Sequence, residues 1–171
     1  MKVIMYMAMT PNGYIAKEDD WSEFLDSEAW AEYLETAKSA GNVVMGRRTY
    51  EIALGQGEFP FKDCLNVVMT SQKIVNEWPE SVTFTNAAPA GVLKMLEKKG
   101  FKSVFLAGGG KVNSSFLKEG LVDEIYLDVV PFAFGKGVKL FAESDFEVKL
   151  KVLDVKKSAD DVVMLHYKVL K

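Results

Sequence analysis

The apolar residues of this chain fall into short runs, separated by stretches in which they recur every three or four positions. Nearly unbroken apolar runs are typical of strands buried on both faces of a parallel sheet, and helical spacing is typical of helices that cover such a sheet. We therefore expect strands at residues 3–9, 43–45, 65–69, 81–85, 103–107 and 124–130. Helices are expected at residues 30–37, 47–54, 86–99 and 112–119, with Asn86 as the cap of the third.

The C-terminal segment has a different pattern, in which apolar and polar residues alternate strictly. Phe146, Val148, Leu150 and Val152 share one face, and the same alternation returns at 163–169. Such a pair of segments around a turn predicts an antiparallel hairpin. The sequence thus predicts an α/β fold whose central sheet is mostly parallel, finished by an antiparallel C-terminal hairpin. Ligands of such sheets bind beyond the carboxyl ends of the strands.

Composition narrows the class of protein. The chain has 171 residues, of which 49% are hydrophobic and 26% charged, which predicts one globular domain over residues 1–171. A formal charge of −3 gives no reason to expect a nucleic-acid partner. The single cysteine, Cys64, and the single histidine, His166, cannot build a conventional zinc cluster. A lone cysteine and an N-terminal apolar run too short to span a membrane predict a cytoplasmic protein without membrane partners.

The first candidate site is the segment Gly46-Arg47-Arg48-Thr49, which follows a predicted strand. Glycine permits a tight turn, the following helix would present free N–H groups, and two arginines add fork-shaped donors for phosphate. The alternative is a solvated helix start with two surface charges.

The second candidate is Gly108-Gly109-Gly110-Lys111, again between a predicted strand and a helix. Three glycines allow a pyrophosphate to approach backbone N–H groups closely, although a tight structural turn is the alternative. The segment matches neither the full dinucleotide fingerprint nor a P-loop.

The third candidate is Thr70-Ser71-Gln72, whose small hydroxyls at a strand end can bind phosphate but are also common in turns. Three such ends in one sheet outline an extended ligand that carries several phosphates, such as a dinucleotide.

These segments resemble those of dihydrofolate-reductase-like proteins. The resemblance lies in Gly-Arg-Arg-Thr-Tyr-Glu at 46–51, the triple glycine at 108–110 and the turn at 9–16. The stretches 122–131 and 135–141 are more similar to one branch, the reductase domain of riboflavin biosynthesis. That domain is the C-terminal half of bifunctional deaminase-reductases. The resemblance covers the whole chain and implies the three-layer fold of that family.

The resemblance also implies an NADPH-dependent oxidoreductase that transfers a hydride to a pyrimidine-ribosyl or related small substrate, with the deaminase half absent. The cofactor-binding positions that it implies are Ala8, Ile15, Gly46, Arg47, Arg48, Thr49, Thr70, Ser71, Gln72, Gly108, Gly109, Gly110, Lys111 and Val112. Of these, Ala8 and Ile15 would border the nicotinamide, and Ser71 and Gln72 would lie beside the adenosine 2′-phosphate.

At the expected substrate-binding positions, the sequence differs from both the folate enzymes and the riboflavin branch. Trp30 falls near the position where folate enzymes carry a carboxylate, and Asn12 replaces an aspartate of the riboflavin branch. We expect Asn12 and Trp21 to bind substrate, although Trp21 could instead pin its loop to the core. We hypothesise that Asp128 replaces the missing carboxylate as an anchor or proton relay. The alternative is that Asp128 is solvated or paired with a lysine.

Two other functions remain open at this point, namely a divergent dihydrofolate reductase and a non-catalytic NADPH-binding protein. Members of the riboflavin branch commonly pair through their sheets, so the resemblance implies a homodimer. Neither His166 nor Cys64 is expected to be catalytic.

Overall fold

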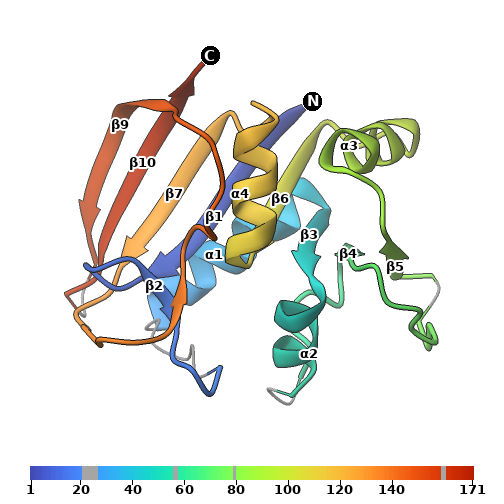
Figure 1. Cartoon of the computed structure of the whole chain (residues 1–171), viewed down its shortest axis with the longest axis horizontal. Helices are drawn as coiled ribbons and strands as arrows, with labels where there is room; N and C mark the ends of the chain where they lie inside the picture. The colour runs from blue at the N-terminus through green and yellow to red at the C-terminus, as the bar shows by residue number, and fades with distance from the viewer. Residues whose placement is uncertain (21–26, 56–57, 79, 159–160) are drawn as a thin grey trace.

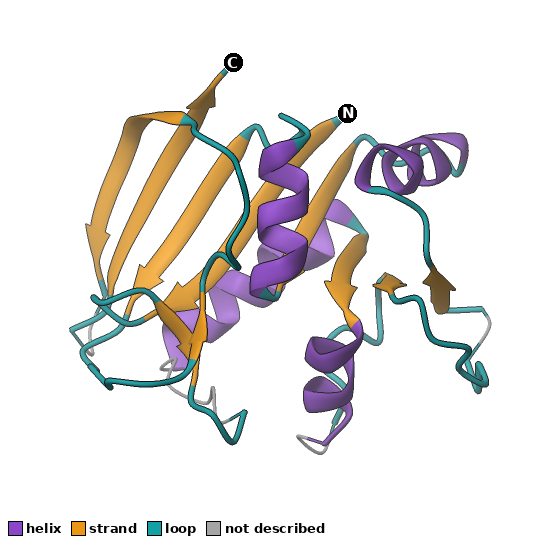
Figure 2. Ribbon diagram, in the orientation of Figure 1, coloured by secondary structure: helices purple, strands orange, loops and turns teal. Residues whose placement is uncertain are grey.

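The computed structural model describes residues 1–20, 27–55, 58–78, 80–158 and 161–171, and shows a sheet with helices on both faces (Figure 1, Figure 2). The helices are α1 (Ser27–Ala40), α2 (Arg47–Gly55), α3 (Pro89–Lys98) and α4 (Gly110–Lys118). The strands are β1 (Lys2–Met9), β2 (Tyr14–Ala16), β3 (Asn42–Gly46), β4 (Leu65–Met69), β5 (Val82–Thr85), β6 (Ser103–Gly108), β7 (Glu124–Val129), β8 (Val138–Lys139), β9 (Lys149–Lys157) and β10 (Val163–Leu170).

The main sheet has eight strands in the order β5-β4-β3-β6-β1-β7-β10-β9. The first six of these pair in parallel, and β10 is antiparallel to both of its neighbours. The expected α/β class, the parallel sheet and the C-terminal hairpin are all confirmed. A separate antiparallel ribbon of β2 and β8 lies at the edge where the parallel strands end.

Two apolar cores hold the layers together. On one face of the sheet, α1 and α2 pack against Tyr6, Val43, Met45 and Phe105. On the other, α3 and α4 cover alternate residues of the same strands, so the central strands bury apolar side chains on both faces. Figure 1 shows α4 on the near side of the sheet and α1 on the far side. None of the described helices is long and apolar enough to cross a membrane.

The start of α3 differs from the expectation. Its N-cap is Ala88, which makes no side-chain cap hydrogen bond, and Pro89 occupies the first turn. The prediction of Asn86 as the cap was therefore wrong. Proline suits a first turn because its fixed φ is already helical and its missing N–H would have had no helical partner.

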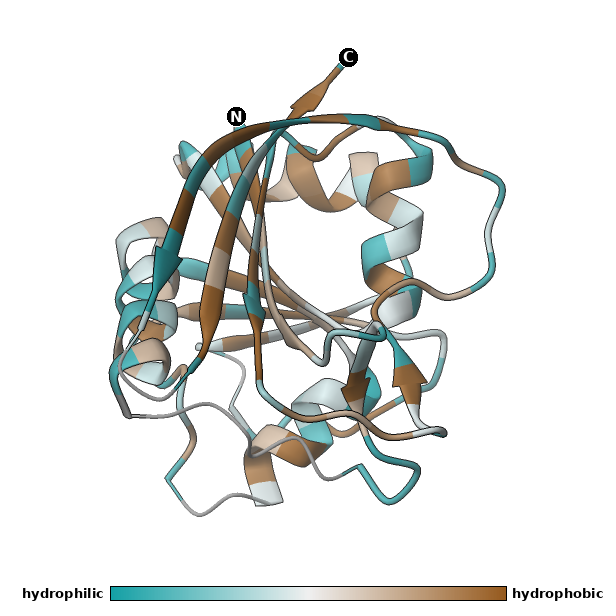
Figure 3. Cartoon of the chain, turned by 90° about the vertical axis from the view of Figure 1, so that its left-hand side faces the viewer, coloured by the Kyte–Doolittle hydropathy of each residue, from teal (hydrophilic) through white to brown (hydrophobic). Residues whose placement is uncertain are grey.

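The outer hairpin contains an irregularity that the strict alternation did not predict. His166 pairs with Asp154 and Tyr167 pairs with Val152, so Leu153 is an extra residue on β9. After this bulge Val155 joins the apolar face of the hairpin. All nine residues of β9 are exposed, including Val152 at 55% and Val155 at 56%. Figure 3 turns this edge of the sheet toward the viewer.

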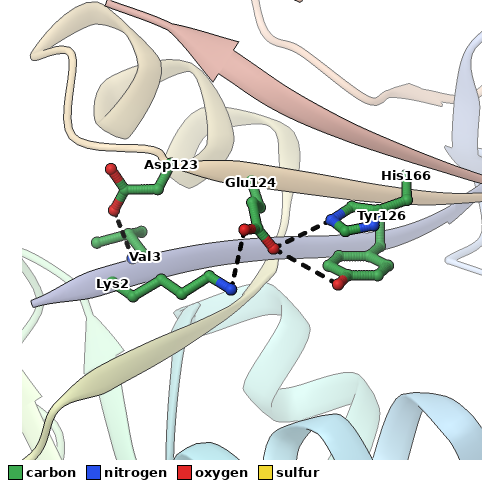
Figure 4. A network of polar contacts seen from close by, with 6 residues as sticks. All are labelled: Lys2, Val3, Asp123, Glu124, Tyr126 and His166. Carbon is green, nitrogen blue, oxygen red and sulfur yellow. Dashed lines mark hydrogen bonds and ion pairs between the residues drawn. The ribbon is translucent and has the colours of Figure 1, made fainter. Parts of the chain in front are cut away.

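Asp123 connects three strands at the N-terminal edge of the parallel sheet. The carboxylate of Asp123 accepts a hydrogen bond of 2.8 Å from the backbone N–H of the buried Val3 (Figure 4). It also forms an ion pair of 2.6 Å with Lys171. The backbone of Asp123 also bonds to Val3 and Val169. One residue thus joins β1, the start of β7 and the end of β10.

We predict that Asp123→Ala lowers the free energy of unfolding by about 1–3 kcal/mol, because it leaves the Val3 N–H without its charged acceptor. Denaturant unfolding measures the change. The control is Lys171→Ala, which removes only the exposed ion pair and should cost about 0–1 kcal/mol. Equal losses in the two variants would contradict the assigned role of the Val3 hydrogen bond.

Candidate functional site

A cavity of about 810 Å³ opens at the carboxyl ends of β1, β3, β4 and β6. This volume falls within the usual range for small-molecule and cofactor sites. Every cofactor-binding position named from the sequence lines the cavity, with the exception of Gly108. The three strand ends that were separate in the sequence therefore meet around one space.

The first strand end joins β3 to α2 at Gly46. Helix α2 begins at Arg47 and has no acidic residue in its first turn, so its positive end is open to an anion. The guanidinium of Arg47 donates to both carboxylate oxygens of Glu51, at 2.6 and 2.7 Å. Arg48 forms an ion pair with Asp20, a residue that also lines the cavity.

The second strand end joins β6 to α4 through the triple glycine. Gly108 has a φ of +82°, and the peptide bond between it and Gly109 is cis. Gly109 is the N-cap of α4 and offers no side chain to the N–H groups of the first turn. A Cβ on Gly110 would overlap the backbone of Lys139 in β8, so glycine is required there by close packing.

The two phosphate-type loops lie directly against each other. A Cβ on Gly109 would come within 3.5 Å of the Thr49 hydroxyl and 3.6 Å of the Ile15 side chain. A Cβ on Gly46 would lie 3.4 Å from the Val112 side chain. Helices α2 and α4 therefore direct their N-terminal ends at the same part of the cavity.

The third strand end follows β4. The Thr70 hydroxyl accepts a hydrogen bond of 3.1 Å from the backbone N–H of Gln72, which shapes the turn. Ser71 and Gln72 are exposed at the cavity rim. Their hydroxyl and amide groups can donate hydrogen bonds to a ligand at this end.

Ala8 and Ile15, the positions predicted to border a nicotinamide, lie near the middle of the carboxyl edge of the sheet. Ala8 is the penultimate residue of β1, and Ile15 belongs to the β2–β8 ribbon, which runs past the triple glycine. Both side chains line the cavity. The donor set of helix ends, arginines, Lys111 and hydroxyls matches an elongated polyphosphate ligand, so the residues present fit a phosphorylated dinucleotide. No group of three potential metal-ligating side chains occurs among the described residues.

Asp128 and Asn12 lie outside the cavity lining. Asp128 is 1% exposed, and its carboxylate accepts a hydrogen bond from the Tyr6 hydroxyl. Asn12 shapes its own turn, where it accepts from the Thr10 hydroxyl at 2.8 Å and donates to the Phe134 carbonyl at 3.0 Å. Trp21 lies outside the described residues. The structure thus brings neither Asp128 nor Asn12 to the described cavity wall.

Two aromatic residues that were not among the predicted site residues also line the cavity. Trp30 and Tyr33 project from α1, and their rings stack at 5.3 Å with an interplanar angle of 11°. Tyr33 lies over the buried pair formed by Tyr6 and Asp128. Burial, followed by the nearby Asp128, raises the pKa of Tyr33, so its hydroxyl remains protonated at neutral pH. Helical spacing showed that these residues face inward, but not that this part of α1 faces a ligand space.

His166 and Cys64 lie away from this cavity. His166 stacks on Tyr126 and lies 3.0 Å from Glu124, which also pairs with Lys2 at 2.9 Å (Figure 4). Burial alone would raise the pKa of Glu124, but its hydrogen bonds to Lys2 and His166 lower it overall. The thiol of Cys64 is buried 3.6 Å from the Ala37 carbonyl oxygen, and burial raises its pKa, which disfavours a nucleophilic thiolate.

Comparison with known proteins identifies the family of this chain. Residues 61–164 match the model of the RibD C-terminal domain. The uncharacterized protein YwjB of Bacillus subtilis is 31% identical over 170 residues, which cover 97% of both chains. YyaP of the same organism is 24% identical over 97% of this chain and 94% of its own.

Solved structures show the same fold. A protein of Shewanella sp. PV-4, provisionally named a riboflavin biosynthesis protein, has a TM-score of 0.84 at 23% identity, with both chains covered completely. Acinetobacter baumannii RibD has a TM-score of 0.80 at 20% identity, over 99% of this chain and 58% of that one. The three-layer dihydrofolate-reductase-like architecture is thereby confirmed, and this chain belongs to the RibD C-terminal domain family.

Proposed function

We propose that this protein is an NADPH-dependent reductase. The observation that carries the proposal is the convergence of the N-terminal ends of α2 and α4, with Arg47, Arg48 and Lys111, on one cavity at the carboxyl edge of a parallel sheet. Helix N-termini and guanidinium groups bind phosphate, and NADPH carries a pyrophosphate and a further 2′-phosphate. Membership of the RibD C-terminal domain family supports a reductase.

Each strand end has its own part in binding. Thr49 and the first N–H groups of α2 would hold phosphate together with the two arginines. The N–H groups of Gly110 and Lys111 would hold the pyrophosphate, where no side chain obstructs the backbone. Ser71 and Gln72 would donate to the 2′-phosphate, which distinguishes NADPH from NADH.

When bound, the nicotinamide supplies a hydride for a carbon–nitrogen double bond or a ring-opened sugar imine. The apolar side chains of Ala8 and Ile15 would orient the ring, and the β2–β8 ribbon would exclude water from one side of it. Asp128 acts as a positioning residue in this proposal, because its hydrogen bond from Tyr6 fixes the aromatic floor below Tyr33.

The proposal includes a homodimer formed through β9. In the described part of the chain, this strand is the last of the sheet, with β10 on one side and no further strand on the other, and it exposes Leu150, Val152, Leu153 and Val155. Exposed apolar edge strands are prone to pair with another chain. A second copy of β9 would cover both the backbone and the apolar side chains.

We predict that NADPH raises the melting temperature of the protein more than NADH does. At about one hundred times the dissociation constant, the ligand should add about 2.7 kcal/mol, or roughly 5–10 °C for a chain of this size. Thermal-shift assays measure this, and an Arg47→Ala/Arg48→Ala variant should lose most of the stabilisation by both nucleotides. No shift with either nucleotide would overturn the proposal, and binding without hydride transfer to any pyrimidine or pterin would favour a non-catalytic nucleotide-binding protein. Turnover of dihydrofolate would favour a divergent folate reductase.

We predict that Asp20→Asn tightens NADPH binding by about two- to fivefold. The ion pair of Asp20 with Arg48 must be broken before that arginine can meet a phosphate, and an exposed pair is worth about 0–1 kcal/mol. Titration calorimetry tests this. Glu58→Gln, which removes an ion pair with Lys62 outside this cavity, is the matched control and should leave the affinity unchanged. Weaker binding in the Asp20 variant would show that this carboxylate orients the arginine instead.

We predict a mass of about twice 19.1 kDa in solution by light scattering. Val152→Lys/Val155→Lys should reduce this to the monomer mass, because charges on the apolar face of β9 oppose its burial. Lys168→Ala on neighbouring β10 serves as the control. A monomeric wild type would contradict the dimer.

A further inference from the structure

The substrate end of the cavity has an aromatic wall whose position is closely fixed. Tyr33 stacks on Trp30, meets Phe105 edge-on at 4.9 Å and meets Tyr6 at 5.1 Å with an angle of 65°. Phe61, whose ring centroid is 6.2 Å from that of Tyr33, continues the wall. A pre-formed aromatic surface favours a flat ring, because stacking is gained without ordering the side chains first.

The cationic residues of the cavity lie on its other side. Among the described residues, the lining cations are Arg47, Arg48, Lys111 and Lys139. The first three begin α2 and α4, where the cofactor phosphates are proposed to bind. Lys139 belongs to β8, whose backbone lies against Gly110. None of these four comes from the elements that carry Trp30, Tyr33 or Phe61.

The charge behind the aromatic wall is acidic. Asp128 lies buried below Tyr33, and its presence raises the pKa of both Tyr33 and Tyr6, after the larger effect of burial. A buried carboxylate at this end would also disfavour a phosphate dianion. Residues 21–26 and 56–57, which border the described part of α1 and α2, contain no Lys, Arg or His in the sequence.

A second cavity of about 820 Å³ lies beyond Trp30, Pro60 and Phe61 and offers no better phosphate site. Its two lysines, Lys38 and Lys62, are outnumbered by three carboxylates, and one of these, Glu58, pairs with Lys62. A phosphate that passed the aromatic wall would therefore meet net negative charge.

We propose that the substrate of this protein is a flat, unphosphorylated heteroaromatic ring that binds against Trp30 and Tyr33. The inference rests on the proposed function, because it uses the phosphate loops for the cofactor. It distinguishes this chain from relatives whose substrate carries a phosphoribosyl group. Such a group appears in the name of a Thermotoga maritima deaminase-reductase. That protein is 19% identical over 99% of this chain and 56% of its own, with a TM-score of 0.77. Trp30 is the specificity-determining residue in this proposal.

The test compares 5-amino-6-ribosylaminouracil with its 5′-phosphate, a pair that differs only in the phosphate. Calorimetry on the protein saturated with NADP⁺ measures both, and 7,8-dihydropterin is the third probe. We expect the unphosphorylated uracil to bind at least as tightly as its phosphate. Trp30→Ala should weaken ring binding about tenfold or more, whereas Trp30→Phe should retain it. Trp78→Ala, which removes an exposed tryptophan elsewhere, should change nothing.

The outcomes separate the two proposals. Binding of the phosphate ester more than tenfold tighter than that of the unphosphorylated uracil would overturn the inference about substrate. So would failure of both unphosphorylated rings to bind. Failure of NADP⁺ itself to bind would instead overturn the reductase proposal, and the same titrations on the nucleotide-free protein would still decide between the two uracils. Unchanged NADP⁺ affinity in the Trp30 variants shows that they are folded.

Discussion

The arrangement of this protein depends on the close approach of backbone to backbone around the triple glycine. Gly110 lies against the β8 main chain, Gly109 faces Thr49 and Ile15, and Gly108 lies against Met7. No other residue type fits Gly110, because a Cβ would occupy the space of the neighbouring carbonyl. This contact brings the β2–β8 ribbon, α2 and α4 to one edge of the sheet, and the cavity is the space they enclose.

The cavity has two chemically different parts as a result. Helix N-termini, guanidinium groups and hydroxyls gather where α2 and α4 begin, and aromatic rings gather where α1 begins. Helices α2 and α4 follow directly on β3 and β6 and present their first N–H groups to the cavity, whereas α1 lines it with the side chains of Trp30 and Tyr33. In the proposed function, these two parts would hold the phosphates and the flat ring respectively.

Ion pairs within the chain set the electrostatics of the phosphate part. Arg47 pairs with Glu51 and Arg48 pairs with Asp20, so both arginines are neutralised before any ligand arrives. A ligand that displaces these carboxylates gains the full charge of both guanidinium groups. Specificity at this edge then depends on exchange between ion pairs as well as on the number of cations.

Much of the fold was predictable because its signals are local. The apolar runs gave the parallel strands to within about two residues, and the glycine and arginine segments marked two of the helix starts, since period and backbone freedom are properties of neighbouring residues. The bulge at Leu153 was missed because pairing with β10 outweighs simple alternation. The start of α3 was missed because the fit of Pro89 in the first turn outweighs the capping preference of Asn86.

The sequence by itself determined the class of fold and the resemblance to a reductase family, and it marked the three strand ends that line the cavity. Only the tertiary structure decided that Trp30 and Tyr33 face the ligand space, that Asp20 holds Arg48, and that Asp128 lies buried beneath the cavity wall. Each of these depends on contacts between residues far apart in the chain. Periodicity shows that a side chain points inward, but the packing of the whole sheet decides whether it meets core or cavity.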